Sequence, residues 1–268
     1  MNEPGLISVV IPCYNDGQFL PETVDRVKQQ TYKNFEIIIV NDGSDDPHTI
    51  NVLTELSKDE SLTILHKENG RMSSARNYGV KHAKGEIIVP LDADDYFHPT
   101  FFEKALPLLF SDPQIAVVTS YIRKFGKDTG LFKVRGGNVY NFLFSNQCPA
   151  CAMIKKTCWD EIGGYDEEMK LGFEDWEFYL RLTAAGYKVH VIPEALFYYR
   201  QTHKSTLHND TYPNKSIIVD YILKKHKDVY IESLKQLITK EQVLYTESRI
   251  SWQNILKMIR NRLSGKFR

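Results

Sequence analysis

The chain has 268 residues, 42% of them hydrophobic, and its 34 basic side chains balance its 34 acidic side chains. This balance argues against nucleic acid as the main partner, because binding to a phosphate backbone needs an excess of Lys and Arg. The first residues lack the basic segment of a signal peptide, and no apolar run reaches the roughly 18 residues that span a bilayer. We therefore expect a cytoplasmic protein.

The first ninety residues alternate buried-strand patterns with helical patterns. Asn15-Asp16-Gly17 is followed by a helical pattern with Pro21 in its first turn, as is common at helix starts. Alternation at this spacing predicts βαβ units and a parallel sheet. The predicted strands are Ile7–Pro12, Phe35–Val40, Leu62–His66 and Glu86–Leu91, and the two further helices are Thr49–Leu56 and Ser73–Ala83.

The second half is less regular. Its pattern predicts an α/β domain over residues 1–210 and a helical C-terminal appendage over residues 211–268. The predicted elements are a helix at Thr100–Phe110, a strand at Ile115–Phe125, a mobile loop at Lys127–Asn138, a strand at CAMI, a turn-rich segment at Trp159–Met169, a helix at Glu174–Ala185, an extended segment at Lys188–Arg200 and helices from Tyr212 onward.

Four cysteines occur, at Cys13, Cys148, Cys151 and Cys158. The pair Cys148 and Cys151 has the CxxC spacing of zinc and redox motifs, but no second CxxC and no nearby His pair completes a zinc site. We therefore expect small buried thiols of the kind that a reducing compartment retains.

Polar segments follow three of the predicted strands directly: Cys13–Asn15, Asn41–Ser44 and Asp92–Asp95. Ligands of parallel α/β sheets bind at the carboxyl ends of the strands. We therefore expect these three segments to line one crevice.

Asp92, Asp94 and Asp95 stand close together and repel one another unless a positive charge lies among them. Carboxylates with open positions suit Mg²⁺ or Mn²⁺. The alternative is that Asp94 or Asp95 caps the helix that begins near Thr100. An EF-hand is excluded because Phe97 stands where its loop needs Gly, and an aspartyl phosphatase would need a downstream lysine and hydroxyl loop that has no obvious place here.

Seven short segments at or near these strand ends form an ordered pattern. They are Ile11–Asn15, Val40–Asp46, Glu68–Gly70, Ala75–Gly79, Leu91–Asp95, Gly163–Asp166 and Phe173–Glu177. In this order and spacing they resemble the family 2 glycosyltransferases of the GT-A fold, over about residues 6 to 205. The resemblance implies a Rossmann-type, mostly parallel sheet flanked by helices. It also implies inverting transfer of a sugar from a nucleotide diphosphate donor, usually UDP-linked, to an acceptor hydroxyl.

The resemblance also implies roles for single residues on the donor side. Asp94 would bind the Mn²⁺ or Mg²⁺ ion that holds the diphosphate. The others would contact the donor: Pro12, Tyr14 and Asn15 line the nucleotide pocket, Asp42 hydrogen-bonds the base, Arg76 lies near the base and diphosphate, and Asp92 approaches the ribose. Taken alone, Asp42 is also a typical turn residue, and Arg76 could form a surface ion pair.

By the same resemblance, Asp175 is the general base that takes the proton of the acceptor hydroxyl. Its place at a helix start favours the carboxylate form. Glu174 and Trp176 would contact the acceptor or the donor sugar, Trp176 by stacking, although both acids are also common as first-turn helix charges. After the last strand, His203 would complete the metal site, and Arg200 or Lys204 would contact the diphosphate, whereas an isolated His in a polar loop is more often solvated.

Two other functional classes are relevant: a catalytically inactive binding protein, which remains the alternative, and a nucleotidyltransferase, which the sequence disfavours. A protein that keeps the pocket but is catalytically inactive would bind nucleotide sugar only, and the presence of both Asp94 and Asp175 favours the enzyme. A nucleotidyltransferase would need a basic, Gly-rich loop after the first strand, and Cys13–Gln18 contains no basic residue. The acceptor, a surface polysaccharide, a lipid-linked oligosaccharide or a protein, is not readable from the sequence.

The last twenty residues, Arg249–Arg268, carry six basic side chains and no acidic one. An apolar stripe at helical spacing accompanies them, and this pattern predicts an amphipathic helix. Such a helix can contact an anionic membrane surface, a second subunit or the catalytic domain. The stripe consists of Trp252, Ile255, Leu256, Ile259 and Leu263.

Overall fold

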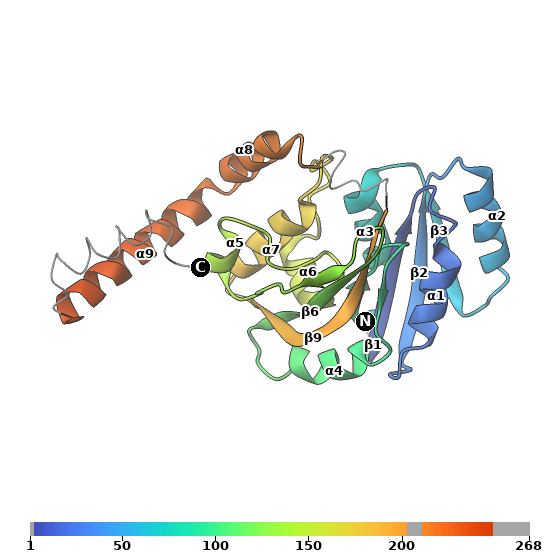
Figure 1. Ribbon diagram of the computed structural model, residues 1–268, viewed down its shortest axis with the longest axis horizontal. Coiled ribbons are helices and arrows are strands. Elements are labelled where there is room, and N and C mark those ends of the chain that lie inside the picture. The colour runs from blue at the N-terminus through green and yellow to red at the C-terminus, as the bar shows by residue number, and fades with distance from the viewer. Residues whose placement is uncertain (1–2, 203–210, 249–268) are drawn as a thin grey trace. The chain divides into compact units, whose positions relative to one another are not determined.

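A nine-stranded mixed sheet organises the protein (Figure 1). The structure is a computed structural model that describes residues 3–202 and 211–248. The chain divides into two compact units, Met1–Ile222 and Leu223–Arg268, and the sheet belongs to the first.

The first half of the sheet is parallel, as the strand–helix alternation predicts. Four strands lie in the order β3-β2-β1-β4, with every neighbouring pair parallel. The carboxyl ends of these strands therefore lie along one edge, which is where the predicted crevice has to form. The strands are β1 (Glu3–Cys13), β2 (Phe35–Asp42), β3 (Leu62–Lys67) and β4 (Gly85–Pro90), and the helices between them are α1 (Leu20–Lys28), α2 (Pro47–Leu56) and α3 (Arg71–His82).

The second half of the sheet is mixed, so the expectation of a mostly parallel sheet holds for the first half alone. A short strand, β8 (Met153–Lys155), lies antiparallel between β4 and β6 (Ile115–Gly126). Beyond it, β6 pairs in parallel with the long β9 (Lys188–Gln201). The antiparallel strands β5 (Tyr96–Phe97) and β7 (Gly130–Phe132) complete the sheet, and β7 lies within the segment that the sequence predicts as a loop.

Helices cover both faces of the sheet. The main hydrophobic core joins the inward side chains of β1 and β2 to α1, α2 and α4 (Phe101–Leu109). On the opposite face, α3 lies directly on β1 and β2. A Cβ atom on Gly79 would come within 2.3 Å of Val10 Cγ1 and 2.9 Å of Val40 Cγ2, so this close approach depends on glycine.

The segment predicted as turn-rich begins inside a helix. Trp159 belongs to α6 (Lys156–Ile162), which ends at Gly163 in the left-handed conformation with φ of 79°. The helix has only seven residues, too few to display a helical period in the sequence. The one-turn helix α5 (Val139–Phe142) precedes α6, and α7 (Glu174–Ala184), which the sequence predicts, follows it.

The C-terminal residues described are helical, as the sequence predicts. They form α8 (Lys215–Lys225), in which Ile218 and Ile222 are buried, and α9 (Lys227–Ser248). None of the helices in the described ranges is long and apolar enough to cross a membrane. The basic segment Arg249–Arg268 lies outside the described residues.

All four cysteines are buried and form no disulfide, which confirms the prediction of structural thiols. Burial raises the pKa of the Cys13 thiol to about 11 and also raises the pKa values of Cys148, Cys151 and Cys158. These thiols therefore stay protonated at neutral pH.

Candidate active site

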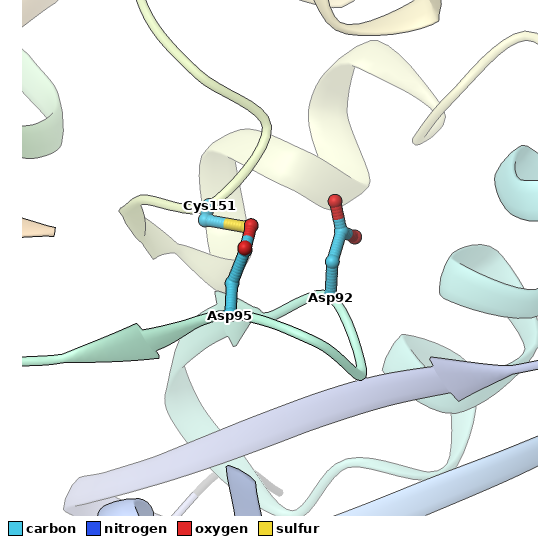
Figure 2. A group of neighbouring side chains, drawn as sticks. All are labelled: Asp92, Asp95 and Cys151. Atoms are coloured by element: carbon cyan, nitrogen blue, oxygen red, sulfur yellow. The ribbon is translucent and has the colours of Figure 1, made fainter. Parts of the chain in front are cut away.

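The aspartates of the LDADD segment form a tight turn directly after β4. The backbone N–H of Asp95 donates to the carbonyl of Asp92 at 3.1 Å, which closes the turn. As a result, the side chains of Asp92 and Asp95 project from neighbouring points of one turn (Figure 2). The pair of carboxyl groups that the turn brings together is thus Asp92 and Asp95, whereas the sequence predicts Asp92 and Asp94.

Asp95 is fully buried and is not a helix cap. Its Oδ1 accepts a hydrogen bond from the backbone N–H of Arg200 at 2.7 Å, whereas its Oδ2 is buried with no hydrogen-bond partner. Helix α4 begins after Thr100 without a side-chain cap, so the alternative of an aspartate cap is wrong. Asp95 instead ties the end of β4 to the end of β9, because Arg200 lies in that strand.

Asp94 is partly buried beside its two acidic neighbours. Burial, followed by the negative charges of Asp92 and Asp16, raises the pKa of Asp94 to about 7, and the positive charge of Arg200 acts in the opposite direction. The guanidinium Nε of Arg200 donates to the Asp94 carbonyl at 2.8 Å, and its Nη2 pairs with Glu22 at 2.6 Å. Arg200, which the resemblance places at the diphosphate, thus lies next to Asp94, the predicted metal ligand.

The positive charge among these acids is Arg76 of α3. Its side chain is 2% exposed, with Nη2 2.6 Å from Asp92 Oδ1 and Nη1 2.8 Å from Glu174 Oε1. Its guanidinium also lies 5.3 Å from the ring centre of Tyr165. Burial opposes the charge of this side chain, but Asp92, together with Glu174, holds the pKa of Arg76 above its usual value. The surface ion pair considered for Arg76 is therefore excluded.

The first turn of α7 brings two further acids to the site. Asp175 accepts hydrogen bonds from the backbone N–H of Trp176 at 2.8 Å and from the Asn146 amide at 2.7 Å. Burial, followed by the negative charge of Glu174, raises the pKa of Asp175 to about 7, against the opposing effect of Arg76. Burial therefore outweighs the helix N-terminus, and Asp175 is balanced between acid and base near neutral pH.

Trp176 faces the interior. It is 5% exposed, its indole N–H donates to the Phe142 carbonyl at 2.6 Å, and its ring meets Phe173 edge to face. The expected stacking of this ring on a sugar does not agree with such burial. In a helix, neighbouring residues point about 100° apart, so Trp176 turns into the core while Asp175 stays at the site.

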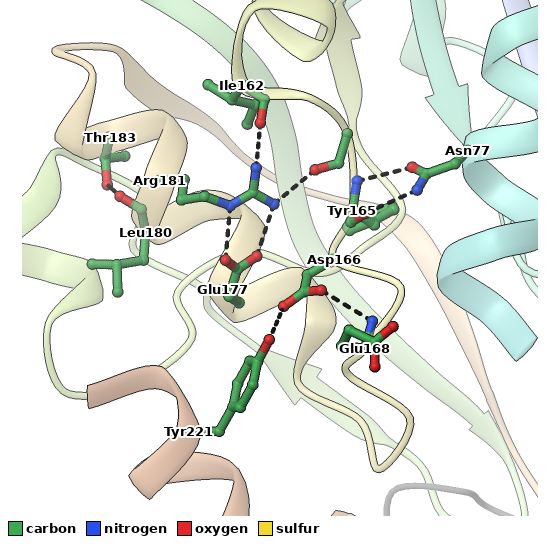
Figure 3. Close-up of polar contacts among 11 residues, drawn as sticks. Asn77, Ile162, Tyr165, Asp166, Glu168, Glu177, Leu180, Arg181, Thr183 and Tyr221 are labelled. Atoms are coloured by element: carbon green, nitrogen blue, oxygen red, sulfur yellow. Dashed lines mark hydrogen bonds and ion pairs between the residues drawn. The ribbon is translucent and has the colours of Figure 1, made fainter. Parts of the chain in front are cut away.

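The loop that carries Tyr165 is held from three helices (Figure 3). Asn77 of α3 exchanges hydrogen bonds of 2.8 Å with the backbone N–H and C=O of Tyr165. From α7, Arg181 pairs with the fully buried Glu177 and donates to the carbonyls of Ile162 and Gly164. From α8, the Tyr221 hydroxyl donates to Asp166 at 2.7 Å. These contacts fix the position of the aromatic ring beside Arg76.

The loops after β1 and β2 are joined through Asn15. Its side-chain amide donates to Asp45 at 2.7 Å and accepts from the backbone N–H groups of Asp45 and Asp46. The neighbouring Tyr14 is 47% exposed, so its ring is accessible to a ligand. Pro12 is buried within β1, in register with Val40 of β2.

Asp42 is 2% exposed at the end of β2. Its Oδ1 accepts from Lys67 Nζ at 2.6 Å and from the backbone N–H of Gly70 at 3.0 Å. Lys67 is thus a charged residue at the carboxyl end of β3, next to Asp42, that the sequence pattern does not single out. His203 and Lys204, predicted at the metal and the diphosphate, lie outside the described residues.

Carboxylate oxygens of this turn fit the Mn²⁺ or Mg²⁺ ion that the resemblance implies, because hard cations prefer oxygen ligands. The buried, unpaired Oδ2 of Asp95 supports the fit, since it lacks the positive partner that a carboxylate requires. Among the described residues, three potential ligand atoms lie within 4.8 Å of one another, from Asp92, Asp95 and Cys151 (Figure 2). The predicted ligand Asp94 is not in this group, and a thiol such as that of Cys151 suits softer metals than Mn²⁺.

Cys151 and Asn146 are two further site residues that sequence reasoning missed. Both come from the irregular segment between α5 and β8, which has no periodic pattern. The only signal was the CxxC spacing of Cys151, which suggested a different chemistry. The antiparallel insertion of β8 next to β4 brings this segment to the site.

Two family models match this chain. A family model described as glycosyl transferase family 2 matches residues 8–163, and another, described as the N-terminal domain of galactosyltransferase, matches residues 140–205. An uncharacterized glycosyltransferase of Rickettsia typhi is 28% identical over 254 residues, which cover 89% of this chain and 74% of that protein.

Two solved structures share the fold. S. aureus TarS 1–349 in complex with UDP-GlcNAc has a TM-score of 0.63 at 18% identity, over 76% of this chain and 60% of that chain. The mannosyltransferase PcManGT from Pyrobaculum calidifontis, in complex with GDP-Man and Mn²⁺, has a TM-score of 0.60 at 20% identity, over 75% of this chain and 59% of that chain. The fold is therefore that of GT-A glycosyltransferases. Because the first family model also spans more than half of the sequence, the chain belongs to glycosyl transferase family 2.

Proposed function

We propose that the protein transfers a sugar from a nucleotide diphosphate sugar, UDP-linked by the resemblance, to an acceptor hydroxyl with inversion at the anomeric carbon. The observation that carries the proposal is Asp175, whose pKa is raised to about 7, next to Glu174, which Arg76 connects to Asp92 of the turn after β4. A general base works best when its pKa lies near the working pH. The solved relatives with UDP-GlcNAc and with GDP-Man and Mn²⁺ support a nucleotide-sugar donor.

The reaction requires one proton transfer and one displacement. Asp175 accepts the proton of the acceptor hydroxyl as that oxygen bonds to the anomeric carbon, and the bond from that carbon to the diphosphate oxygen breaks with its electron pair. A Mn²⁺ or Mg²⁺ ion held by Asp94, with Asp92 nearby, would neutralise the charge that develops on the diphosphate. Arg200 lies beside this turn and adds a fixed positive charge.

The nucleotide would bind over the ends of β1 and β2. Tyr14 offers an exposed ring for the base, and Asn15 holds the two loops together. Asp42 already accepts from Lys67 and Gly70 through one oxygen, which orients the carboxylate for a donor N–H of the base.

A screen of nucleotide sugars tests this function. Donor hydrolysis and thermal shift are measured for UDP- and GDP-linked sugars with Mn²⁺, with Mg²⁺ and with chelator. We expect one donor to raise the melting temperature and to be hydrolysed only when metal is present. Stabilisation without any hydrolysis or transfer would favour the alternative of a catalytically inactive nucleotide-sugar-binding protein.

Asp94→Ala tests the metal. Removing this carboxylate should abolish UDP-stimulated Mn²⁺ binding in calorimetry and transfer, while the fold is retained. Asp128→Ala, at an exposed position between β6 and β7, is the matched control and should bind Mn²⁺ normally. Unchanged Mn²⁺ binding by Asp94→Ala would refute the assignment.

We further propose a role in the synthesis of a surface polysaccharide or another glycoconjugate, with a saccharide or lipid-linked acceptor. Cytoplasmic location, peripheral contact with the inner face of the membrane through the basic C-terminal segment and assembly into a homo-oligomer remain predictions. The membrane contact and the assembly follow from the sequence pattern of residues 249–268 alone.

A further inference from the structure

Arg76 has no group exposed to a ligand. Its side chain is 2% exposed, one terminal nitrogen pairs with Asp92, and the other pairs with Glu174. Its Nε atom is buried without a partner. Family resemblance places this arginine at the nucleotide base and diphosphate, but the geometry leaves it in contact with protein side chains.

The two carboxylates that Arg76 joins belong to different parts of the site. Asp92 follows β4, in the turn that would hold the metal and the donor. Glu174 is the first residue of α7 and directly precedes the base Asp175. These two elements come from distant parts of the sequence, and Arg76 is the residue of α3 that forms ion pairs with both.

The position of Arg76 is itself fixed. Helix α3 lies close to the sheet at Gly79, one turn after Arg76. On the other side, the Tyr165 ring lies 5.3 Å from the guanidinium and is held by Asn77 through its backbone (Figure 3). Because the planar guanidinium of Arg76 cannot move freely, a displacement of Asp92 should shift Glu174, and the reverse.

We propose that Arg76 is a positioning residue that couples the donor side of the site, at Asp92, to the acceptor side, at Glu174 and the start of α7. This inference rests on the proposed function. Its consequence is that Glu174, although on the acceptor side, influences donor affinity, because loss of its charge releases one half of the Arg76 guanidinium. By linkage, donor binding in turn orders the first turn of α7.

Glu174→Gln is the decisive variant, and UDP with Mn²⁺ is the probe. Calorimetry in the absence of acceptor should show UDP affinity weakened by about fivefold or more, the lower end of usual coupling between sites. Asp175→Asn is the matched control, because it removes the neighbouring carboxylate in the same helical turn, which has no ion pair with Arg76. UDP affinity of that variant should stay near the wild-type value.

A double-mutant cycle shows whether the effect passes through Arg76. In an Asp92→Asn background, Glu174→Gln should have little further effect on UDP affinity, since the far end of the connection is already lost. Equal weakening by Glu174→Gln in both backgrounds, or no weakening at all, overturns the inference. Equal weakening by Asp175→Asn also overturns it, because a general loss of charge on α7 would then explain the result.

The same cycle in unfolding free energy needs no ligand and separates the two proposals. Wild-type protein that binds no nucleotide refutes the proposed function and the donor side of this inference, even if Asp92 and Glu174 are coupled in stability. Nucleotide binding with no coupling between Asp92 and Glu174 in either cycle refutes the role of Arg76 alone.

Discussion

Replacing Asp175 by Asn should make the protein less stable than wild type at acid pH and more stable than wild type at alkaline pH. The pKa of Asp175 is raised from 3.8 to about 7 by burial and by Glu174, so the folded protein binds this proton more tightly than the unfolded chain. Stability from this group is complete below pH 3.8 and is lost as pH rises through 7. Asn cannot ionise, so the variant escapes the loss.

The magnitude follows from the shift. Between pH 5 and about pH 7 the Asp175 carboxyl is ionised in the unfolded chain but not in the folded protein. Over each of these two pH units the free energy of unfolding of the wild-type protein falls by about 1.4 kcal/mol. Relative to wild type, Asp175→Asn should therefore gain at most about 3 kcal/mol over this range. Asn has one acceptor oxygen where Asp175 uses two, so one of its two hydrogen bonds, worth about 1 kcal/mol, is lost at both pH values and cancels in the difference.

Urea unfolding of both proteins at pH 5 and pH 8 measures this difference. A difference between the two proteins that does not change with pH would show that Asp175 ionises normally and would refute the reasoning. In the same variant we expect transfer to fall roughly 10²–10⁴-fold, because a general base acts in the chemical step. Wild-type turnover should also fall as pH drops through about 7, where the base becomes protonated.

Three other changes test the structure. Gly79→Ala places a methyl group within 2.3 Å of Val10 Cγ1 and should cost about 1–3 kcal/mol in urea unfolding, whereas an unchanged midpoint would mean that α3 moves freely. Because all four cysteines are buried, a thiol reagent should label the native protein slowly and the urea-unfolded protein quickly, and fast native labelling would contradict the burial. If the C-terminal segment contacts a membrane, full-length protein will co-sediment with anionic vesicles at low salt and a chain that ends near Tyr245 will not; full-length protein that stays in the supernatant assigns the apolar stripe to a protein interface.

The fold was largely predictable because its first half consists of strong local patterns. Runs such as Phe35–Val40 are long, β-branched and bounded by turn residues, and the observed β2 begins at the same residue. Short or irregular elements were not predictable. The three residues of β8 and the seven of α6 are too few to show a period, and neighbouring elements determine their conformation.

The candidate site was predictable in location but less so in connectivity. Since parallel strands end along one edge, Asp42 and Asp92 had to lie on the same side of the sheet. The pairing of Arg76 with Glu174 joins residues 98 positions apart, and no spacing rule reveals it. The inward orientation of Trp176 likewise depends on which face of α7 packs against α5.

The order of the strands also has a consequence for how the protein acquires its activity. Strands β1, β2 and β3 pair with neighbours close in sequence, whereas Ile115 at the start of β6 pairs with Lys188 of β9, far along the chain. Contacts between distant residues form late, because the loop between them must first be closed. During synthesis the edge formed by β1 and β2 can therefore assemble before the turn of α7 that carries Asp175 has left the ribosome. Pulse-labelling hydrogen exchange would show β1 and β2 protected before β9, and simultaneous protection would exclude this order. Under the proposed function, a nascent chain in that state could bind a donor but would lack the base that lets it transfer the sugar.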